Sequence, residues 1–387
     1  QVEDGRIVAV GPAAQLLPPA DPAIPQVEYG GATLLPGLID AHVHLTLRRR
    51  LSAPRPPASV TEGHALLYGV QAARNVLASG VTTVRDCAAR GQHAQELRDA
   101  VEEGTIVGPR ILASGPPVTT TAGHIWRMGY EADSVTEMRR AVRRLVKEGV
   151  DFIKVCATGG RGTPGSVVGR AQYSTDELRA VAEDAHRLER HVATHALGTE
   201  GIRRAVEAGI DTIEHCAWLD RDGKTLAFDE AVAERMAEQG LVASIAAGPP
   251  WEVFHQDKEL AGNGSPPTTV AWLDTMRQRW QLVHRMRDFG VTVCFGTDSV
   301  YGMFGDFHDL SYLAQAFVEY GGFAPLDVIE MVTAVPAHAI GWGDRIGTVE
   351  PGKLADLLVI HGNPIEDMRA LHDVAAVYQA GRLVVQK

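Results

Sequence analysis

Short apolar segments alternate with amphipathic segments along most of this chain of 387 residues. The apolar segments are rich in β-branched residues and have the length of buried strands. Eight of them end near His44, Asp86, Gly115, Ala157, His195, His215, Ala247 and Asp298. The stretches between them, such as residues 134–148, 175–190 and 229–239, show helical spacing. Eight strand-and-helix units predict an α/β fold, a (β/α)8 TIM barrel.

The two ends of the chain show a different pattern. Residues 1–35 and 346–387 are short alternating segments separated by turns, which is typical of β-hairpins. Neither end is long enough to bury a core by itself. We therefore expect one small β-sandwich domain formed by residues 1–35 and 346–387, beside a barrel domain of residues 36–345.

Composition and charge speak against a nucleic-acid-binding protein and against a membrane protein. The net charge of -11 and the lack of a basic patch speak against nucleic acid as a partner. No apolar run is long enough to span a membrane, so we expect no membrane partner. No signal peptide is visible, which favours a cytoplasmic protein. The chain opens at Gln1, inside what reads as a strand, so we expect its N-terminus to be incomplete.

Polar residues end several of the predicted strands. His42 and His44 lie at positions i and i+2 of one strand and therefore share a face. The C-terminal strand ends of a barrel meet at one mouth, which would bring together His42, His44, Lys154, His195, His215 and Asp298. Histidine and aspartate suit zinc, manganese, cobalt or iron. For each histidine alone, a hydrogen-bonded core residue is the more common role.

Lys154 is harder to explain without a chemical role. It lies between Ile153 and Val155 in a strand that should be buried. Burial of an unpaired ammonium costs several kcal/mol, and a buried lysine tends to lose its charge. An inward-facing lysine at this place therefore indicates a function.

The polar strand ends together resemble the amidohydrolase superfamily, and the resemblance covers nearly the whole chain. Residues 36–44 fit its opening motif, and residues 346–357 are similar to its closing motif in the terminal sheet. Residues 152–160 resemble a branch that includes imidazolonepropionase-like, prolidase-like and arginine/lysine carboxypeptidase-like proteins. In that branch the strand lysine is carbamylated and bridges two metal ions.

The resemblance implies a role for each residue. His42, His44 and Asp298 would hold one divalent metal ion, His195 and His215 the other, and carbamylated Lys154 would be shared, with zinc as the expected metal. A hydroxide between the metals would attack the scissile carbonyl, and Asp298 would carry its proton to the leaving amine. His124 would bind substrate, and Tyr173 would meet the substrate carboxylate. Each of the last two could instead be a loop residue with a local hydrogen bond.

Three functions remain open. The first is hydrolysis of an amide bond in a small peptidic or N-acyl amino acid substrate. The second uses the same site on a xenobiotic carbamate, phenylurea or lactone, for which the apolar residues 251–254 would suit an aromatic group. The third is a non-catalytic structural protein, which the complete set of ligand positions disfavours. In each case we expect a homo-oligomer, and for the enzymes a small-molecule substrate.

Overall fold

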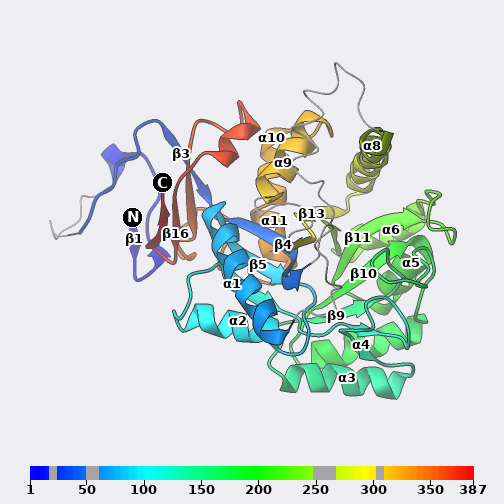
Figure 1. The fold of residues 1–387 in the computed structure, drawn as a ribbon. Coiled ribbons are helices and arrows are strands. Elements are labelled where there is room, and N and C mark those ends of the chain that lie inside the picture. The colour runs from blue at the N-terminus through cyan, green and yellow to red at the C-terminus, as the bar shows by residue number, and fades with distance from the viewer. Residues whose placement is uncertain (17–23, 49–60, 247–266, 302–308) are drawn as a thin grey trace.

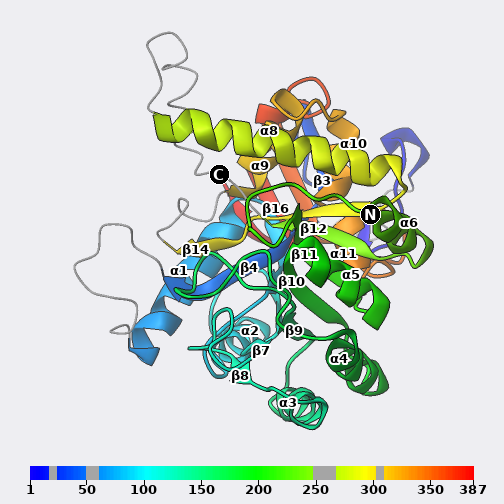
Figure 2. The same ribbon diagram turned by 90° about the vertical axis from the view of Figure 1, so that its right-hand side faces the viewer.

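The computed structural model describes residues 1–16, 24–48, 61–246, 267–301 and 309–387. Within these ranges, parallel strands form the walls of a barrel (Figures 1 and 2). They are β4 (Leu38–Arg48), β5 (Val81–Asp86), β6 (Arg110–Ala113), β9 (Ile153–Cys156), β10 (Val192–Gly198), β11 (Thr212–Leu219), β12 (Val242–Ala246) and β13 (Thr292–Gly296). These strands coincide with the eight apolar segments of the sequence, so the predicted α/β barrel is confirmed.

The first and last strands of the barrel meet. The backbone N–H of Asp298 donates to the carbonyl of His42 at 2.8 Å. The short strand β14 (Ser299–Tyr301) continues this contact and pairs parallel to β4. On the other side, β7 (Val118–Thr119) bridges to β9 and carries the short β8 (Tyr130–Glu131). The C-terminal ends of β4 and β13 therefore lie next to each other.

Helices cover the outside of the barrel (Figure 2). They are α1 (Glu62–Ala78), α2 (His93–Glu102), α3 (Val135–Lys147), α4 (Thr175–Arg187), α5 (Thr199–Ala208), α6 (Glu230–Glu238), α8 (Pro267–Asp288), α9 (Asp309–Glu319), α10 (Pro325–Met331) and α11 (Ala334–Ala339). Helix α4 begins with a capping box, in which Ser174 and Glu177 satisfy each other's backbone N–H groups. No helix of the described ranges is both long and apolar enough to cross a membrane.

Both chain ends contribute to a four-stranded antiparallel sheet beside the barrel (Figure 1). Its order is β17 (Arg382–Gln386), β16 (Val374–Gln379), β15 (Leu357–His361) and β3 (Ala32–Pro36). A hairpin of β1 (Val2–Glu3) and β2 (Arg6–Ile7) lies at the N-terminus, and two 3-10 turns, η1 (Ala13–Gln15) and η3 (Met368–His372), complete the ends. The expected sheet from both ends is thus present; the domain boundaries at residues 35/36 and 345/346 stay a prediction.

Candidate metal centre

The predicted ligands from β4 and β13 come together at the mouth of the barrel. His44 Nε2 lies 3.1 Å from Asp298 Oδ1, and His42 Nε2 lies 3.6 Å from the same oxygen. These three residues offer ligand atoms that all lie within 4.8 Å of one another. Gly296 permits this approach, since a Cβ there would lie 2.4 Å from the Cβ of His42. The group has the composition of a first metal site.

The histidines of β10 and β11 extend this cluster. The ring centroid of His215 lies 5.1 Å from that of His42 and 4.5 Å from that of His195. His195 and His215 are both buried. Burial lowers the pKa of each of these two histidines, so both are held as neutral imidazoles. A neutral imidazole is the form that binds a metal.

Three of the histidines, His44, His195 and His215, each have one ring nitrogen bonded to a backbone carbonyl. His44 Nδ1 lies 3.2 Å from the carbonyl of Ala88, and His215 Nδ1 lies 2.8 Å from that of Ala246. His195 Nε2 lies 3.1 Å from the carbonyl of Gly159. A carbonyl only accepts hydrogen bonds, so these nitrogens carry the proton. The lone pair is then left on Nε2 of His44 and His215 and on Nδ1 of His195.

The contact between His44 and Asp298 needs a positive charge. His44 Nδ1 already donates to Ala88, so a neutral ring would direct the lone pair of Nε2 at a carboxylate oxygen 3.1 Å away. Burial lowers the pKa of His44, but the hydrogen bond and charge of Asp298 outweigh it and raise the pKa overall. A proton on Nε2 would satisfy the pair. A metal cation between the two atoms would satisfy it equally well.

Lys154 lies in β9 and is almost completely buried, with 2% of its surface exposed. Its Nζ has no hydrogen-bond partner among the described residues. Its positive charge lowers the pKa of His42, His195 and His215, after the larger effect of burial. A buried, unpartnered ammonium is costly, and carbamylation would convert it into a ligand with two oxygens. The predicted residues therefore fit a pair of divalent cations.

Glu214 is a site residue that the sequence analysis missed. Its Oε2 accepts a hydrogen bond from His42 Nδ1 at 2.8 Å, which leaves His42 Nε2 to face Asp298. Its Oε1 accepts from Arg85 Nη2 at 2.5 Å and from the Thr212 hydroxyl at 2.9 Å. Burial raises the pKa of Glu214, but the charges of Arg85 and Lys154 outweigh it and hold the pKa well below its ordinary value. Glu214 is thus a carboxylate that fixes the orientation of His42.

The backbone explains why this residue was missed. Glu214 is in register with His195 on β10, so it faces the barrel interior, and strand alternation would direct His215 outward. His215 instead has a φ of 66°. This left-handed conformation costs about 1–3 kcal/mol for a residue with a side chain. Asp298 has a similar φ of 53°. Both strained residues are predicted ligands, and their conformation turns them towards the mouth.

His124 is also brought to the cluster. It lies in the loop between β7 and β8, 7% exposed, and its ring centroid is 4.3 Å from that of His195. Its Nδ1 lies 3.2 Å from the hydroxyl of Thr163. The pKa of His124 is lowered to about 3, mainly by burial. The ring therefore offers a neutral nitrogen next to the histidines of the centre.

Tyr173, the residue expected to meet the substrate carboxylate, has its hydroxyl bonded inside the protein. Its side chain is 1% exposed, and its hydroxyl donates to the carbonyl of Ala132 at 3.0 Å. Burial raises the pKa of this phenol. The sequence shows a tyrosine on the loop after β9, but not that its hydroxyl is already used inside the molecule. This geometry gives no support to the predicted substrate contact. The apolar residues 251–254, which we expected to suit an aromatic substrate group, lie outside the described residues.

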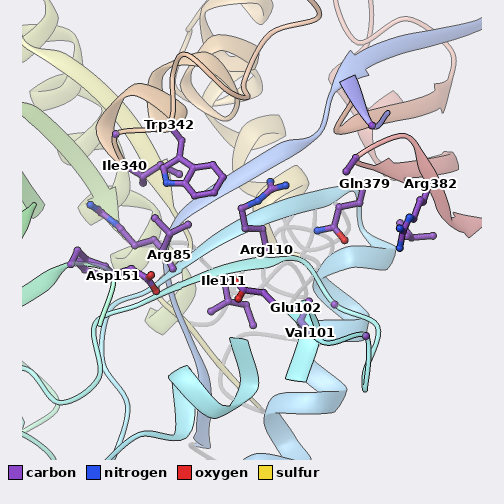
Figure 3. Close-up of a pocket in the computed structure, with 18 of the residues that line it drawn as sticks. Arg85, Val101, Glu102, Arg110, Ile111, Asp151, Ile340, Trp342, Gln379 and Arg382 are labelled. Carbon is purple, nitrogen blue, oxygen red and sulfur yellow. The ribbon is translucent and has the colours of Figure 1, made fainter. Parts of the chain in front are cut away.

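A cavity of about 1260 Å³ lies at the opposite end of the barrel (Figure 3). It is lined by residues that precede barrel strands, such as Asp151, and by Gln379 and Arg382 of the terminal sheet. Arg85 also lines it, but the guanidinium of Arg85 is bound to Glu214 and to the carbonyl of Ala41. Because the predicted ligands lie at the other strand ends, this cavity is separate from the candidate metal centre.

The sequence matches the Amidohydrolase family over residues 33–384. An ochratoxinase of Aspergillus niger is 30% identical over 388 residues, which covers 90% of this chain and 75% of that protein. An imidazolonepropionase of Symbiobacterium thermophilum is 25% identical and covers 99% of this chain and 89% of that protein.

Solved structures agree with these matches. A Xaa-Pro dipeptidase with methionine bound in its active site superposes with a TM-score of 0.81 at 28% identity, covering 100% of this chain and 94% of the other. A prolidase in complex with N-methylphosphonate-L-proline gives a TM-score of 0.80 at 28% identity, with the same coverage. The similarity therefore extends over the barrel and the terminal sheet together.

Proposed function

Because this chain belongs to the amidohydrolase family and is a hydrolase, we propose that it cleaves the amide bond of a small N-acyl amino acid or dipeptide at a pair of divalent metal ions. The observation that carries the proposal is the buried Lys154, whose Nζ lacks a hydrogen-bond partner among the described residues and lies among predicted histidine ligands. A site for a single metal would not need this lysine.

The ligand assignment follows the free ring nitrogens. His42 and His44 would bind one ion through Nε2, together with Asp298. His195, through Nδ1, and His215, through Nε2, would bind the other, and carbamylated Lys154 would contact both. Zinc suits this set of nitrogen and oxygen donors. When bound, the two cations would supply Lewis acidity and lower the pKa of a bound water towards about 7.

The remaining steps belong to side chains of this chain. Asp298 would take up the proton of the attacking water on a carboxylate oxygen and pass it to the leaving nitrogen. Burial raises the pKa of Asp298, but the hydrogen bond from His44 and the other nearby histidines outweigh burial and lower it. The group is therefore a carboxylate before the reaction, which is the form that can accept a proton. His124 would donate a hydrogen bond to the carbonyl oxygen of the substrate.

The choice of amide substrates follows from the relatives. One structural relative is named as an Xaa-Pro dipeptidase, an enzyme whose name gives a substrate of this kind, and one sequence relative is named as an ochratoxinase. Structures of molinate hydrolase and phenylurea hydrolase B also match, at 23% and 22% identity. At that identity they support the fold alone, so carbamates and phenylureas enter as the alternative outcome of the test.

The test is a substrate screen with zinc-loaded protein. N-acyl amino acids, Xaa-Pro dipeptides, carbamates and phenylureas are each assayed for release of the amine. We expect the highest kcat/KM within the first two groups, and no release from protein stripped with a chelator. A preference for carbamates or phenylureas would replace the proposed substrate class, and a metal-replete protein inactive on every group would contradict the proposal.

A further inference from the structure

We propose that Arg279 recognises the free carboxylate of the substrate; this inference rests on the proposed function and narrows its substrate class. Arg279 lies in α8, next to the metal centre. Its Nη2 donates to the carbonyl of His215 at 3.2 Å, which places the guanidinium beside a predicted metal ligand. The carboxylate of Asp298 is close enough to raise the pKa of Arg279.

The guanidinium of Arg279 is partly buried, and no described residue forms an ion pair with it. Its hydrogen-bond partner among the residues that the structure describes is a single carbonyl. Other inward-facing arginines differ: Arg85 is paired with Glu214, and Arg110 with Asp356. Arg279 therefore keeps hydrogen-bond donors that the described part of the protein does not use.

The surroundings of Arg279 add a second positive charge. The pKa of Arg279 is lowered to about 10, mainly by burial and also by the charge of Arg161, while Asp298 opposes both effects. Arg161 directly follows Gly160 in the loop after β9 and is exposed. Two arginines from different elements, α8 and this loop, thus lie near each other at the same mouth. An anion between them would relieve their repulsion.

The chemistry of the group selects the ligand. A planar guanidinium binds a carboxylate with two parallel hydrogen bonds, and such charge-assisted bonds are stronger than neutral ones. The free carboxylate of an N-acyl amino acid or of a dipeptide's C-terminal residue meets this requirement, whereas an amide does not. The phenol of Tyr173, which is bonded to Ala132, does not compete for this role. If Arg279 has this role, the enzyme should require a free carboxylate on its substrate.

The test compares the binding of two probes to zinc-loaded protein by isothermal titration calorimetry. The probes are N-acetyl-L-phenylalanine and its C-terminal amide, which differ only in the charge of the recognised group. We expect the wild-type protein to bind the acid about 10- to 100-fold more tightly than the amide, the ratio that one hydrogen bond to a charged group gives. Arg279→Met should abolish this preference, and Arg279→Lys should keep part of it.

Controls separate recognition from structure. Arg277→Met alters an exposed arginine of the same helix and should leave the preference unchanged. Metal content is measured for every variant, because Arg279 contacts the backbone of His215. A structural role would weaken acid and amide binding equally. A wild-type protein without preference for the acid, or an Arg279→Met variant that keeps it, overturns the inference.

The two proposals fail in different ways. If the acid preference depends on Arg279 but no amide bond is hydrolysed, the role of Arg279 stands and the proposed function does not. If the acid and the amide are hydrolysed equally well, the proposed function stands and the role of Arg279 does not.

Discussion

At the scale of single residues, Glu214 fixes the ring orientation of His42. It accepts the hydrogen bond of His42 Nδ1 and is held by Arg85. Carboxylates that orient a ligating histidine typically contribute 10- to 100-fold to metal affinity, about the effect expected here. We expect Glu214→Gln to weaken zinc binding by about this factor, measured by competition with a chromogenic chelator. Glu238→Gln, on the exposed end of α6, is the matched control, and equal affinities of both variants would contradict the role.

Asp298, a predicted metal ligand, is also the residue that we propose as the base. Asp298→Asn keeps an oxygen ligand but removes the proton acceptor. Because general acid–base help contributes about 10²–10⁴-fold, kcat should fall by that factor in a variant whose metal content is retained. Metal analysis and steady-state kinetics on one preparation test this. A metal-replete variant with wild-type kcat would show that another group moves the proton.

At the scale of elements, the loop after β9 positions His124. A Cβ on Gly160 would lie 2.2 Å from the His124 ring, whereas one on Gly162 would lie 3.9 Å away. Gly160→Ala should therefore displace His124 and lower kcat/KM at least about 10-fold, as loss of one stabilising hydrogen bond in the transition state would. Gly162→Ala is the control, with an ordinary contact. Equal kinetics in the two variants would remove His124 from the mechanism.

A carboxylate joins helices α3 and α4. Asp184 of α4 accepts hydrogen bonds from Arg139 and Arg143 of α3, and from Arg187. Burial raises the pKa of Asp184, but these hydrogen bonds outweigh it and hold the pKa below its ordinary value of 3.8. A depressed pKa stabilises the fold above about pH 3.8, and this contribution is lost as the pH falls further.

We therefore expect Asp184→Asn to lower the free energy of unfolding by about 1.5–3 kcal/mol at neutral pH, the value for a hydrogen bond to a charged group. Denaturant titrations at pH 7 and pH 3 measure it, and the difference between variant and wild type should shrink at pH 3. Asp176→Asn, at an exposed carboxylate, serves as control. A loss that is the same at both pH values would contradict the electrostatic origin.

The elements also show how far the sequence could predict the molecule. Apolar runs with polar ends correctly predicted the position of every barrel strand. A buried strand must be apolar along its buried length, so its sequence reveals where it begins and ends. Glu214 was missed because strand alternation assigns it and His215 to opposite faces, and the left-handed backbone at His215 removes this alternation. Tyr173 was assigned to the substrate because a sequence does not reveal that a hydroxyl is already bonded to a distant carbonyl.

At the scale of the whole molecule, the barrel brings together predicted ligands from β4, β9, β10, β11 and the end of β13. Bound metals would therefore join distant parts of the chain. A ligand that binds only the folded state stabilises it by RT ln(1 + [L]/Kd). Zinc should therefore raise the Tm of metal-free protein, in calorimetry, by an amount that grows with zinc concentration. Lys154→Met should show a smaller rise. A Tm independent of zinc would mean that the ligands do not form a metal site.

The proposed two-metal site depends on Lys154, which we propose to be carbamylated and shared by two metal ions. The most direct measurement is ¹³C NMR of protein loaded with zinc in ¹³C-bicarbonate, together with metal analysis of the same sample. We predict a carbamate resonance and two zinc ions per chain in the wild type, with the resonance absent and the zinc content reduced in Lys154→Met. A fully active wild-type protein with one zinc ion per chain and no carbamate resonance would contradict this account.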